Sequence, residues 1–297
     1  MPGPNSHDAE ILKPFTITDG SRFRLSRIRP GDTRGVTSKE HAQERLERNV
    51  RKLTALQERL YAQDSWGVLL IFQAMDAAGK DGAIAHVMSG VNPQGCEVSS
   101  FKAPSAEELD HDYLWRTSKS LPERGRIGIF NRSYYEETLI VRVHPDYLQR
   151  QKLPAGLITR RVWTERFEDI AAFERYLARN GFVIRKFFLH VSKEEQRRRF
   201  LRRIEEPARN WKFSTADAHE REYWKQYMRA YQDMIRHTAA PHAPWIVVPA
   251  DHKWFARLVV GAAVVDALES IHPRFPTVDK AKKKDLAVAR AALKTEA

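Results

Sequence analysis

The chain has 297 residues, of which 42% are hydrophobic and 30% charged, a composition that suits a globular protein of one large or two small domains. No apolar run reaches the ~18 residues that a membrane helix needs, and the N-terminus shows no signal-peptide pattern. Cys96 is the only cysteine, which excludes an intrachain disulfide and a cysteine-based zinc site. A cytoplasmic protein is the simplest expectation. The net charge of +12 favours polyanionic partners.

The pattern along the chain predicts an extended arm over residues 1–38, a single domain over 39–271 and a basic tail over 272–297. Apolar residues recur at helical spacing in 39–62. Predicted strands are 68–72, 97–101, 126–131, 182–191 and 245–248. Predicted helices are 79–88, 105–120, 166–179, one that begins at 192, 215–238, 254–271 and the tail from 279. Strands that alternate with helices imply a parallel sheet covered on both faces, which is an α/β fold.

Residues 66–82 read WGVLLIFQAMDAAGKDG, an apolar strand that runs into a turn of small residues ending at Gly79-Lys80. A helix N-terminus after such a turn binds phosphate, because its unpaired N–H groups and the helix dipole both favour negative charge. The usual pattern is G-x-x-x-x-G-K-[ST], whereas this chain has Ala74 for the first glycine and Asp81 for the hydroxyl residue. Asp76 is a candidate metal ligand or base, since a carboxylate beside phosphate needs Mg²⁺ between them. The alternative is an ordinary strand-to-helix turn.

A second segment, residues 127–137, reads IGIFNRSYYEE and ends a predicted strand in polar residues. Ligands of open α/β sheets bind outside the carboxyl ends of strands, so Arg132, Glu136 and Glu137 could face the same phosphates. The position resembles a Walker B site in which Asn131 replaces the expected Asp. Taken alone, a helix start with acids in its first turn explains this segment slightly better.

A third segment, residues 193–212, holds eight basic and four acidic residues, and its acids cluster at the ends. Runs of charge are usually solvated, but this one passes through Pro207 into a segment that resembles a hinged flap. Kinases need cations that close over the transferred phosphoryl group. The aromatic stripe that follows is expected to form core or subunit contacts rather than a base-stacking surface: Tyr223, Trp224, Tyr227 and Tyr231.

Together, four ordered motifs resemble the polyphosphate kinase 2 family: FQAMDAAGKDG at 72–82, GVNPQG at 90–95, FNRSYYE at 130–136 and NWKF at 210–213. The similarity extends over about residues 39–271. It implies a P-loop-kinase-like, three-layer α/β/α sandwich with a helical lid over about 193–215. It also implies phosphoryl transfer between inorganic polyphosphate and a nucleotide with Mg²⁺, for which Mn²⁺ can substitute.

The resemblance also implies roles for individual residues. Asp76 would handle Mg²⁺ and the acceptor phosphate, Lys80 would bind polyphosphate or the transferred group, and Arg132 would contact phosphate. Glu137, where related chains have Asp, would be a second metal ligand. The remaining residues implied to bind substrate are Ala78, Gly79, Asp81, Gly82, Asn131, Glu136, Arg198, Arg199, Arg202 and Lys212.

The end of the second motif indicates the acceptor. Members that act mainly on diphosphates carry Phe-Asp-Arg-Ser-Trp-Tyr-Asn there, whereas this chain has Asn131 and ends in Tyr135-Glu136-Glu137. It is more similar to the group that accepts both AMP and ADP, with guanine nucleotides as further candidates. We also expect a homodimer or homotetramer, no membrane contact and no nucleic acid as the primary ligand.

Two other functions are compatible with parts of the sequence. An ATP-dependent nucleoside or nucleotide kinase would share the loop, although the missing Ser/Thr and Walker B Asp count against it. A non-catalytic nucleic-acid-binding protein would explain the charge of +12 but not the carboxylates around Gly79-Lys80. Comparing ATP with polyphosphate as donor separates the first alternative, and a turnover assay separates the second.

Overall fold

The computed structural model describes residues 10–295, apart from the side chain of Lys212. Within this range six strands form one sheet in the order β1-β6-β5-β2-β4-β3. The five long strands are parallel, as predicted, whereas the two-residue β1 pairs antiparallel with β6. The strands are β1 Thr16–Ile17, β2 Gly67–Ala74, β3 Cys96–Ser100, β4 Ile127–Asn131, β5 Phe182–His190 and β6 Trp245–Pro249.

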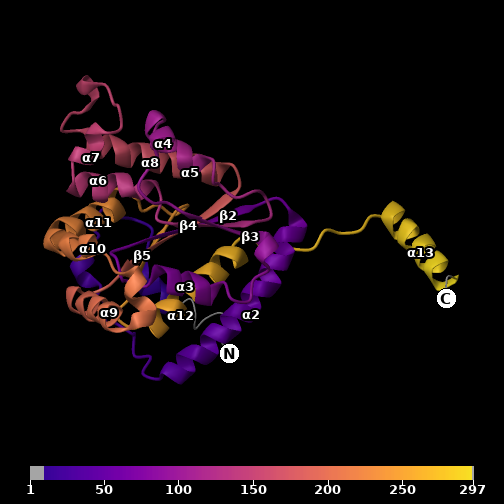
Figure 1. Ribbon diagram of the computed structural model, residues 1–297. Helices are drawn as coiled ribbons and strands as arrows, with labels where there is room; N and C mark the ends of the chain where they lie inside the picture. Colours follow the sequence, from indigo (N-terminus) through magenta and orange to yellow (C-terminus); the bar gives the residue numbers. More distant parts are fainter. Residues whose placement is uncertain (1–9, 296–297) are drawn as a thin grey trace.

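Helices cover both faces of the sheet (Figure 1). One face packs against α3 Lys80–Val87 and α12 Lys253–Glu269, and α2 Lys39–Gln63 packs on α12. The other packs against α8 Val162–Arg179 and α11 Trp224–Thr238, with the short helices α6 Ile140–Val143 and α7 Asp146–Gln149 beside them. Because both faces are covered, every residue of β2 is buried. The three-layer α/β/α architecture is therefore confirmed.

The central strand β2 places the site. It pairs with β4 on one side and β5 on the other, with Phe72 opposite Asn131 and Ala74 opposite Leu189. The carboxyl ends of these three strands therefore meet at one edge of the sheet. In open α/β sheets this edge is where ligands bind.

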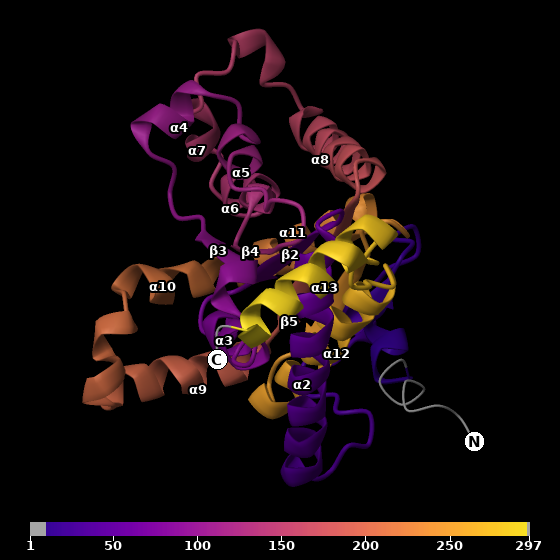
Figure 2. The same cartoon turned by 90° about the vertical axis from the view of Figure 1, so that its right-hand side faces the viewer.

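The N-terminal segment packs onto this body. Phe15, Leu25 and Ile28 are buried in the main core, and β1 adds the edge of the sheet. The arm predicted to be extended therefore contains short helical turns, Lys13–Phe15 and Leu25–Arg27, and several of its residues pack into the core. Residues 1–9 lie outside the described range. The tail helix α13, Lys280–Thr295, stands away from the body in Figure 1 and lies in front of it in the turned view of Figure 2. None of its described residues is buried.

Two predicted helices are wrong in their continuity. The helix expected over 105–120 is divided into α4 Ala106–Asp110 and α5 Trp115–Ser118. Between them the Asp112 carboxylate accepts from the Leu114 N–H (2.9 Å), a local turn that competes with the helix. The helix expected over 215–238 is interrupted by a 3₁₀ turn, Glu220–Tyr223. Here the Arg221 guanidinium reaches back to the carbonyl oxygen of Lys193 (3.1 Å).

The segment predicted as a lid, about 193–215, contains α9 Lys193–Glu205 and a 3₁₀ turn Pro207–Lys212 and ends at the start of α10 Thr215–His219. Figure 2 shows α9 and α10 projecting from the body. Ser192 caps α9 by accepting the Glu195 N–H on its hydroxyl (3.1 Å), so this helix begins where the sequence predicts it. Pro207 forces the preceding Glu206 into an extended conformation, and this ends the helix. No helix in the described range is long and apolar enough to cross a membrane.

Candidate active site

The loop between β2 and α3 has a strained backbone. Gly79 has φ +107°, a conformation that glycine adopts readily, and it directly precedes α3. Ala77 has φ +60°, which is unfavourable for a residue with a Cβ. Arg132, in the turn after β4, has φ +65°. Strained residues of this kind persist only where their surroundings hold them, and they cluster at functional sites.

Arg199 of α9 holds the loop from behind. All five N–H groups of its guanidinium have partners. Nη1 donates to the carbonyls of Ala77 (3.1 Å) and Ala78 (2.6 Å), and Nε donates to Glu195 (2.7 Å). Nη2 donates to the carbonyls of Ala250 (2.6 Å) and Asp251 (3.0 Å). Arg199 is 5% exposed, so we correct its implied role: it holds the loop in place and has no donor left for a substrate.

Arg132 joins the loop to the second motif. Its Nη2 donates to Asp76 Oδ1 (3.1 Å), and its Nη1 lies 3.9 Å from Glu136. Glu136 and Asp76 both raise the pKa of Arg132, so the guanidinium stays charged. Burial raises the pKa of Glu136, and this is opposed by the positive charges of Arg132 and Lys80. The buried amide of Gln73 also lies against Glu136, and the amide orientation that suits both of its neighbours places its nitrogen 2.8 Å from the Glu136 carboxylate as a donor.

Lys80 and Asp81 begin α3 at the same edge. Burial lowers the pKa of Lys80, while Asp76, Glu136 and Asp81 raise it. Asp81 accepts from the amide of Asn131 (2.8 Å). The residue that replaces the usual Ser/Thr of the loop is thus hydrogen-bonded to the residue that replaces the usual Walker B Asp. The predicted residues of the loop and of the second strand end therefore do come together.

These groups line a cavity of about 950 Å³ that extends from the loop to the lid and to the start of α12. The described lining contains nine basic side chains and three acidic ones. The basic residues are Lys80, Lys102, Arg132, Arg199, Arg202, Arg203, Arg209, Lys253 and Arg257, and the acids are Asp76, Asp81 and Asp217.

Like charges crowd around Lys253. Its pKa is lowered first by burial and then by the neighbouring arginines 199, 202, 209 and 257. Repulsion among these cations destabilises the protein when no ligand is bound, and a bound anion would reduce this repulsion. The cavity is therefore suited to a ligand with several negative charges.

Several charged residues of the cavity lining were not predicted, and for two of them the sequence carried a signal. Lys253 and Arg257 follow the carboxyl end of β6 at helical spacing, where the rule for open α/β sheets places ligand contacts. Conversely, Arg198 is not among the described residues that line the cavity. It is largely exposed and pairs with Glu195 (2.5 Å). The side chain of Lys212 is not among those that the structure describes, so its implied role stays a prediction.

Glu137 does not share the site of Asp76. Its buried carboxylate is held by Arg166 of α8 and by the amide of Gln151. A metal there would have to displace a buried, charge-assisted contact. We therefore correct the implied metal role of Glu137 to a structural one.

Asp76 remains a candidate ligand for Mg²⁺, and Asp81, predicted to bind substrate, becomes a second candidate because it lines the same cavity. Both line the cavity and offer carboxylate oxygens, the donors that Mg²⁺ prefers. Among the described residues, no three His, Cys, Asp or Glu side chains are grouped to hold a metal by themselves. This fits an ion bound by one or two carboxylates together with substrate phosphates, which is the usual arrangement for Mg²⁺ in kinases.

Comparison with known proteins identifies the family. The family model of polyphosphate kinase 2 matches residues 36–276. The chain belongs to the polyphosphate kinase 2 family. An "ADP-polyphosphate phosphotransferase" of Rhodopseudomonas palustris is 51% identical over 282 residues, 95% of this chain and 98% of the relative. An "AMP/ADP-polyphosphate phosphotransferase" of Meiothermus ruber is 41% identical, covering 92% of this chain and 98% of the relative.

The fold agrees with this membership. The crystal structure of polyphosphate kinase 2 from Arthrobacter aurescens TC1 superimposes with a TM-score of 0.83 at 38% identity, covering 95% of this chain and 96% of that one. The matched region includes the loop, the second motif, the lid and α12. This member of the polyphosphate kinase 2 family is therefore a kinase, and its basic cavity is lined by residues of three of the four motifs, those at 72–82, 130–136 and 210–213.

Proposed function

We propose that this protein transfers phosphoryl groups between inorganic polyphosphate and adenine nucleotides with Mg²⁺, and that it phosphorylates both AMP and ADP. One observation carries the proposal: the cavity at the phosphate-binding loop continues along a basic surface formed by the lid and α12. A polyphosphate chain carries about one negative charge per phosphate, so repeated cations along a groove suit it, as they suit other polyanions.

The chemistry needs positioning more than acid–base catalysis. An oxygen of the nucleotide phosphate attacks the terminal phosphorus of polyphosphate, a new P–O bond forms, and the bond to the bridging oxygen breaks. The chain becomes one phosphate shorter, and its new terminal oxygen keeps the electron pair. Because the attacking oxygen is already ionised near pH 7, no strong base is required.

Three residues have distinct tasks in this step. Lys80, from the start of α3, neutralises charge on the transferred group. Arg132 contacts phosphate and also holds the Asp76 carboxylate beside the loop. Asp76 orients the acceptor phosphate and, together with Asp81, would hold Mg²⁺. Bound Mg²⁺ supplies charge neutralisation between phosphate oxygens.

The use of AMP as well as ADP is supported by Glu136. This carboxylate lies beside Arg132 and Gln73, facing the loop, at the position that distinguishes the second motif from that of diphosphate-specific members. The Meiothermus relative named for both acceptors is consistent with it, whereas the Rhodopseudomonas relative is named for ADP.

The test is a donor and acceptor comparison. The purified protein is incubated with Mg²⁺ and either polyphosphate or ATP, with AMP, ADP or GDP as acceptor, and the products are separated by anion exchange. We expect ADP and then ATP from AMP with polyphosphate. Transfer to AMP from ATP alone would favour the ordinary nucleotide kinase. If ADP is phosphorylated but AMP is not, the proposed acceptors are restricted to nucleoside diphosphates. Assembly as a homodimer or homotetramer and a cytoplasmic location stay predictions.

A further inference from the structure

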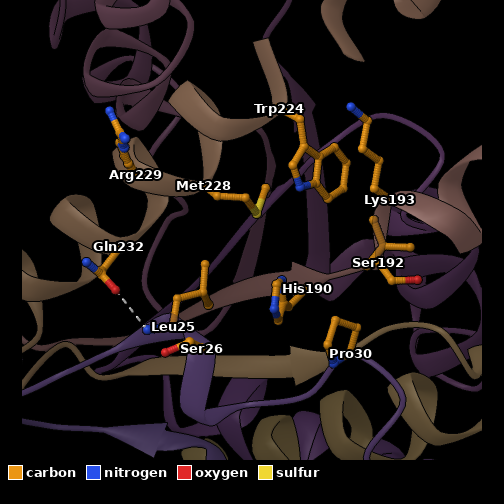
Figure 3. A pocket seen from close by; sticks show the side chains of 11 residues that line it. Leu25, Ser26, Pro30, His190, Ser192, Lys193, Trp224, Met228, Arg229 and Gln232 are labelled. Atoms are coloured by element: carbon orange, nitrogen blue, oxygen red, sulfur yellow. Dashed lines mark hydrogen bonds between the residues drawn. The ribbon is translucent and has the colours of Figure 1, made fainter. Parts of the chain in front are cut away.

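A second cavity, of about 380 Å³, lies where the N-terminal segment, the end of β5 and the start of α11 meet (Figure 3). Its apolar walls come from Leu25, Pro30, Val191, Trp224 and Met228. Among the described residues, none that lines this cavity also lines the basic one. The proposed phosphoryl transfer therefore gives it no task.

His190 makes this cavity more than a packing defect. Its side chain lines the cavity and is 8% exposed, yet Nδ1 has no hydrogen-bond partner in the described part of the chain. An unpaired buried polar atom costs about 1–3 kcal/mol, and such atoms in native proteins call for an explanation. Burial lowers the pKa of His190 to about 4, against the opposing charge of Asp251, so the ring is neutral at pH 7. A neutral ring suits an uncharged polar edge rather than an ion.

We propose that this cavity binds a nucleoside, with its base against Trp224 and one polar edge hydrogen-bonded to His190. Ligand cavities of this size typically combine apolar walls with a few convergent polar groups. Figure 3 shows the indole of Trp224 and the thioether of Met228 on one side, with Leu25 and Pro30 across from them and His190 between. Stacking of a base on an aromatic ring stabilises such complexes by about 1–3 kcal/mol.

The aromatic stripe of α11 is divided accordingly. Tyr227 and Tyr231 are buried in the core, as the sequence predicted for the stripe. Trp224 is only partly buried, and it lines the cavity. One residue of the stripe is thus available for stacking while its neighbours support the fold.

The cavity is also connected to the lid. Lys193 begins α9 at the start of the lid, and Trp224 begins α11, which follows the lid after the 3₁₀ turn Glu220–Tyr223, so residues on either side of the lid contribute to the cavity wall. The carbonyl of Lys193 accepts from Arg221 Nη1 (3.1 Å), which also donates to Gln196 Oε1 (2.7 Å). Gln196 Nε2 in turn donates to the carbonyl of Asp76 (2.9 Å). A bound nucleoside would therefore bridge residues on either side of the lid and reduce its motion.

Binding of adenosine to the full-length protein, measured by equilibrium dialysis, tests the site. Ser26→Phe fills the cavity from its exposed rim, and His190→Leu removes the unpaired nitrogen. We expect each to weaken adenosine binding at least tenfold, while Ser21→Phe, an exposed serine of the same segment outside the cavity lining, binds like the wild type. Thermal unfolding checks folding, and His190→Leu should be no less stable than the wild type. Absence of saturable binding, or binding that Ser26→Phe leaves intact, would overturn the site.

Hydrogen exchange tests the connection to the lid. Adenosine should slow amide exchange over residues 193–223 in the wild type and in Ser21→Phe but not in Ser26→Phe. Unchanged exchange in a protein that binds adenosine would overturn the connection. Neither readout measures phosphoryl transfer, so the outcome is independent of the proposed reaction.

Discussion

At the scale of single residues, identical side chains on one helix have opposite tasks. Arg199 is buried and its five N–H groups all bind the protein, whereas Arg202, three positions later, is largely exposed and lines the cavity with one weak ion pair to Glu206 (3.8 Å). The sequence showed a run of arginines but could not show which of them faces the loop carbonyls. That depends on contacts across more than a hundred positions, which no local pattern encodes.

Substituting lysine separates these two tasks. Arg199→Lys keeps the charge but cannot reach four carbonyl oxygens at once, so we expect a loss of about 2–4 kcal/mol in the free energy of unfolding. Arg202→Lys should change stability by no more than about 0.5 kcal/mol and instead raise the KM for polyphosphate. Denaturant unfolding and initial-rate kinetics on both variants provide the comparison. Equal effects of the two on stability would contradict the structural role of Arg199.

The lowered pKa of Lys80 predicts that activity falls at alkaline pH. Burial lowers its pKa below the ordinary value of 10.5, and the three nearby carboxylates only oppose this. Since the cation is the active form, kcat/KM should fall as pH rises through the lowered pKa. Lys80→Arg keeps its charge at every accessible pH, so its lower activity should lack that fall. The same alkaline limb in both proteins would show that another group is responsible.

At the scale of elements, the strands and their ends could be predicted because apolar runs bounded by turns are local signals. The predicted strand 68–72 corresponds to β2, and 182–191 corresponds to β5, within a few residues. Two helices were predicted as continuous because side-chain turns such as that of Asp112 interrupt a helix without interrupting its apolar pattern. Glu137 was misassigned for a related reason: its partner, Arg166, lies on a distant helix.

The basic surface formed by the lid and α12 predicts a salt dependence. Each cation that contacts polyphosphate should contribute to the slope of log KM against log salt, so Arg257→Ala should reduce that slope by about 1. Arg198→Ala is the matched control, because Arg198 pairs with Glu195 and is not among the described residues of the cavity. Initial rates at several salt concentrations give the slopes. A larger effect of Arg198→Ala would place polyphosphate on the other face of α9.

At the scale of the whole molecule, the two ends of the chain differ in their relation to the core. The sequence predicted both as appendages, since neither shows a strong apolar period. The N-terminal segment nevertheless supplies Phe15, Leu25 and Ile28 to the core, whereas α13 has no buried residue within its described length. Single apolar residues in an irregular segment leave no periodic signal, which is why this packing was not predicted.

Truncation should reveal this difference. Removal of residues 278–297 should shift the Tm by no more than about 2 °C, because no core surface is exposed. Removal of residues 1–30 exposes several core side chains and the edge of β6, so we expect a protein that is far less stable or does not fold. Differential scanning calorimetry of both truncations is the measurement. A large loss of stability on removing the tail would mean that α13 packs against the body or a second copy.

The central claim is that the loop at Gly79-Lys80 moves phosphate from polyphosphate to a nucleotide, with Asp76 orienting the acceptor. The most direct test is ³¹P NMR of polyphosphate, AMP and Mg²⁺ with the wild type and with Asp76→Asn. With the wild type, polyphosphate chains should shorten as ADP and ATP form in matching amounts. Asp76→Asn should show nearly no transfer while its unfolding transition matches the wild type. Near-normal turnover in folded Asp76→Asn, or nucleotide phosphorylation without chain shortening, would contradict the account.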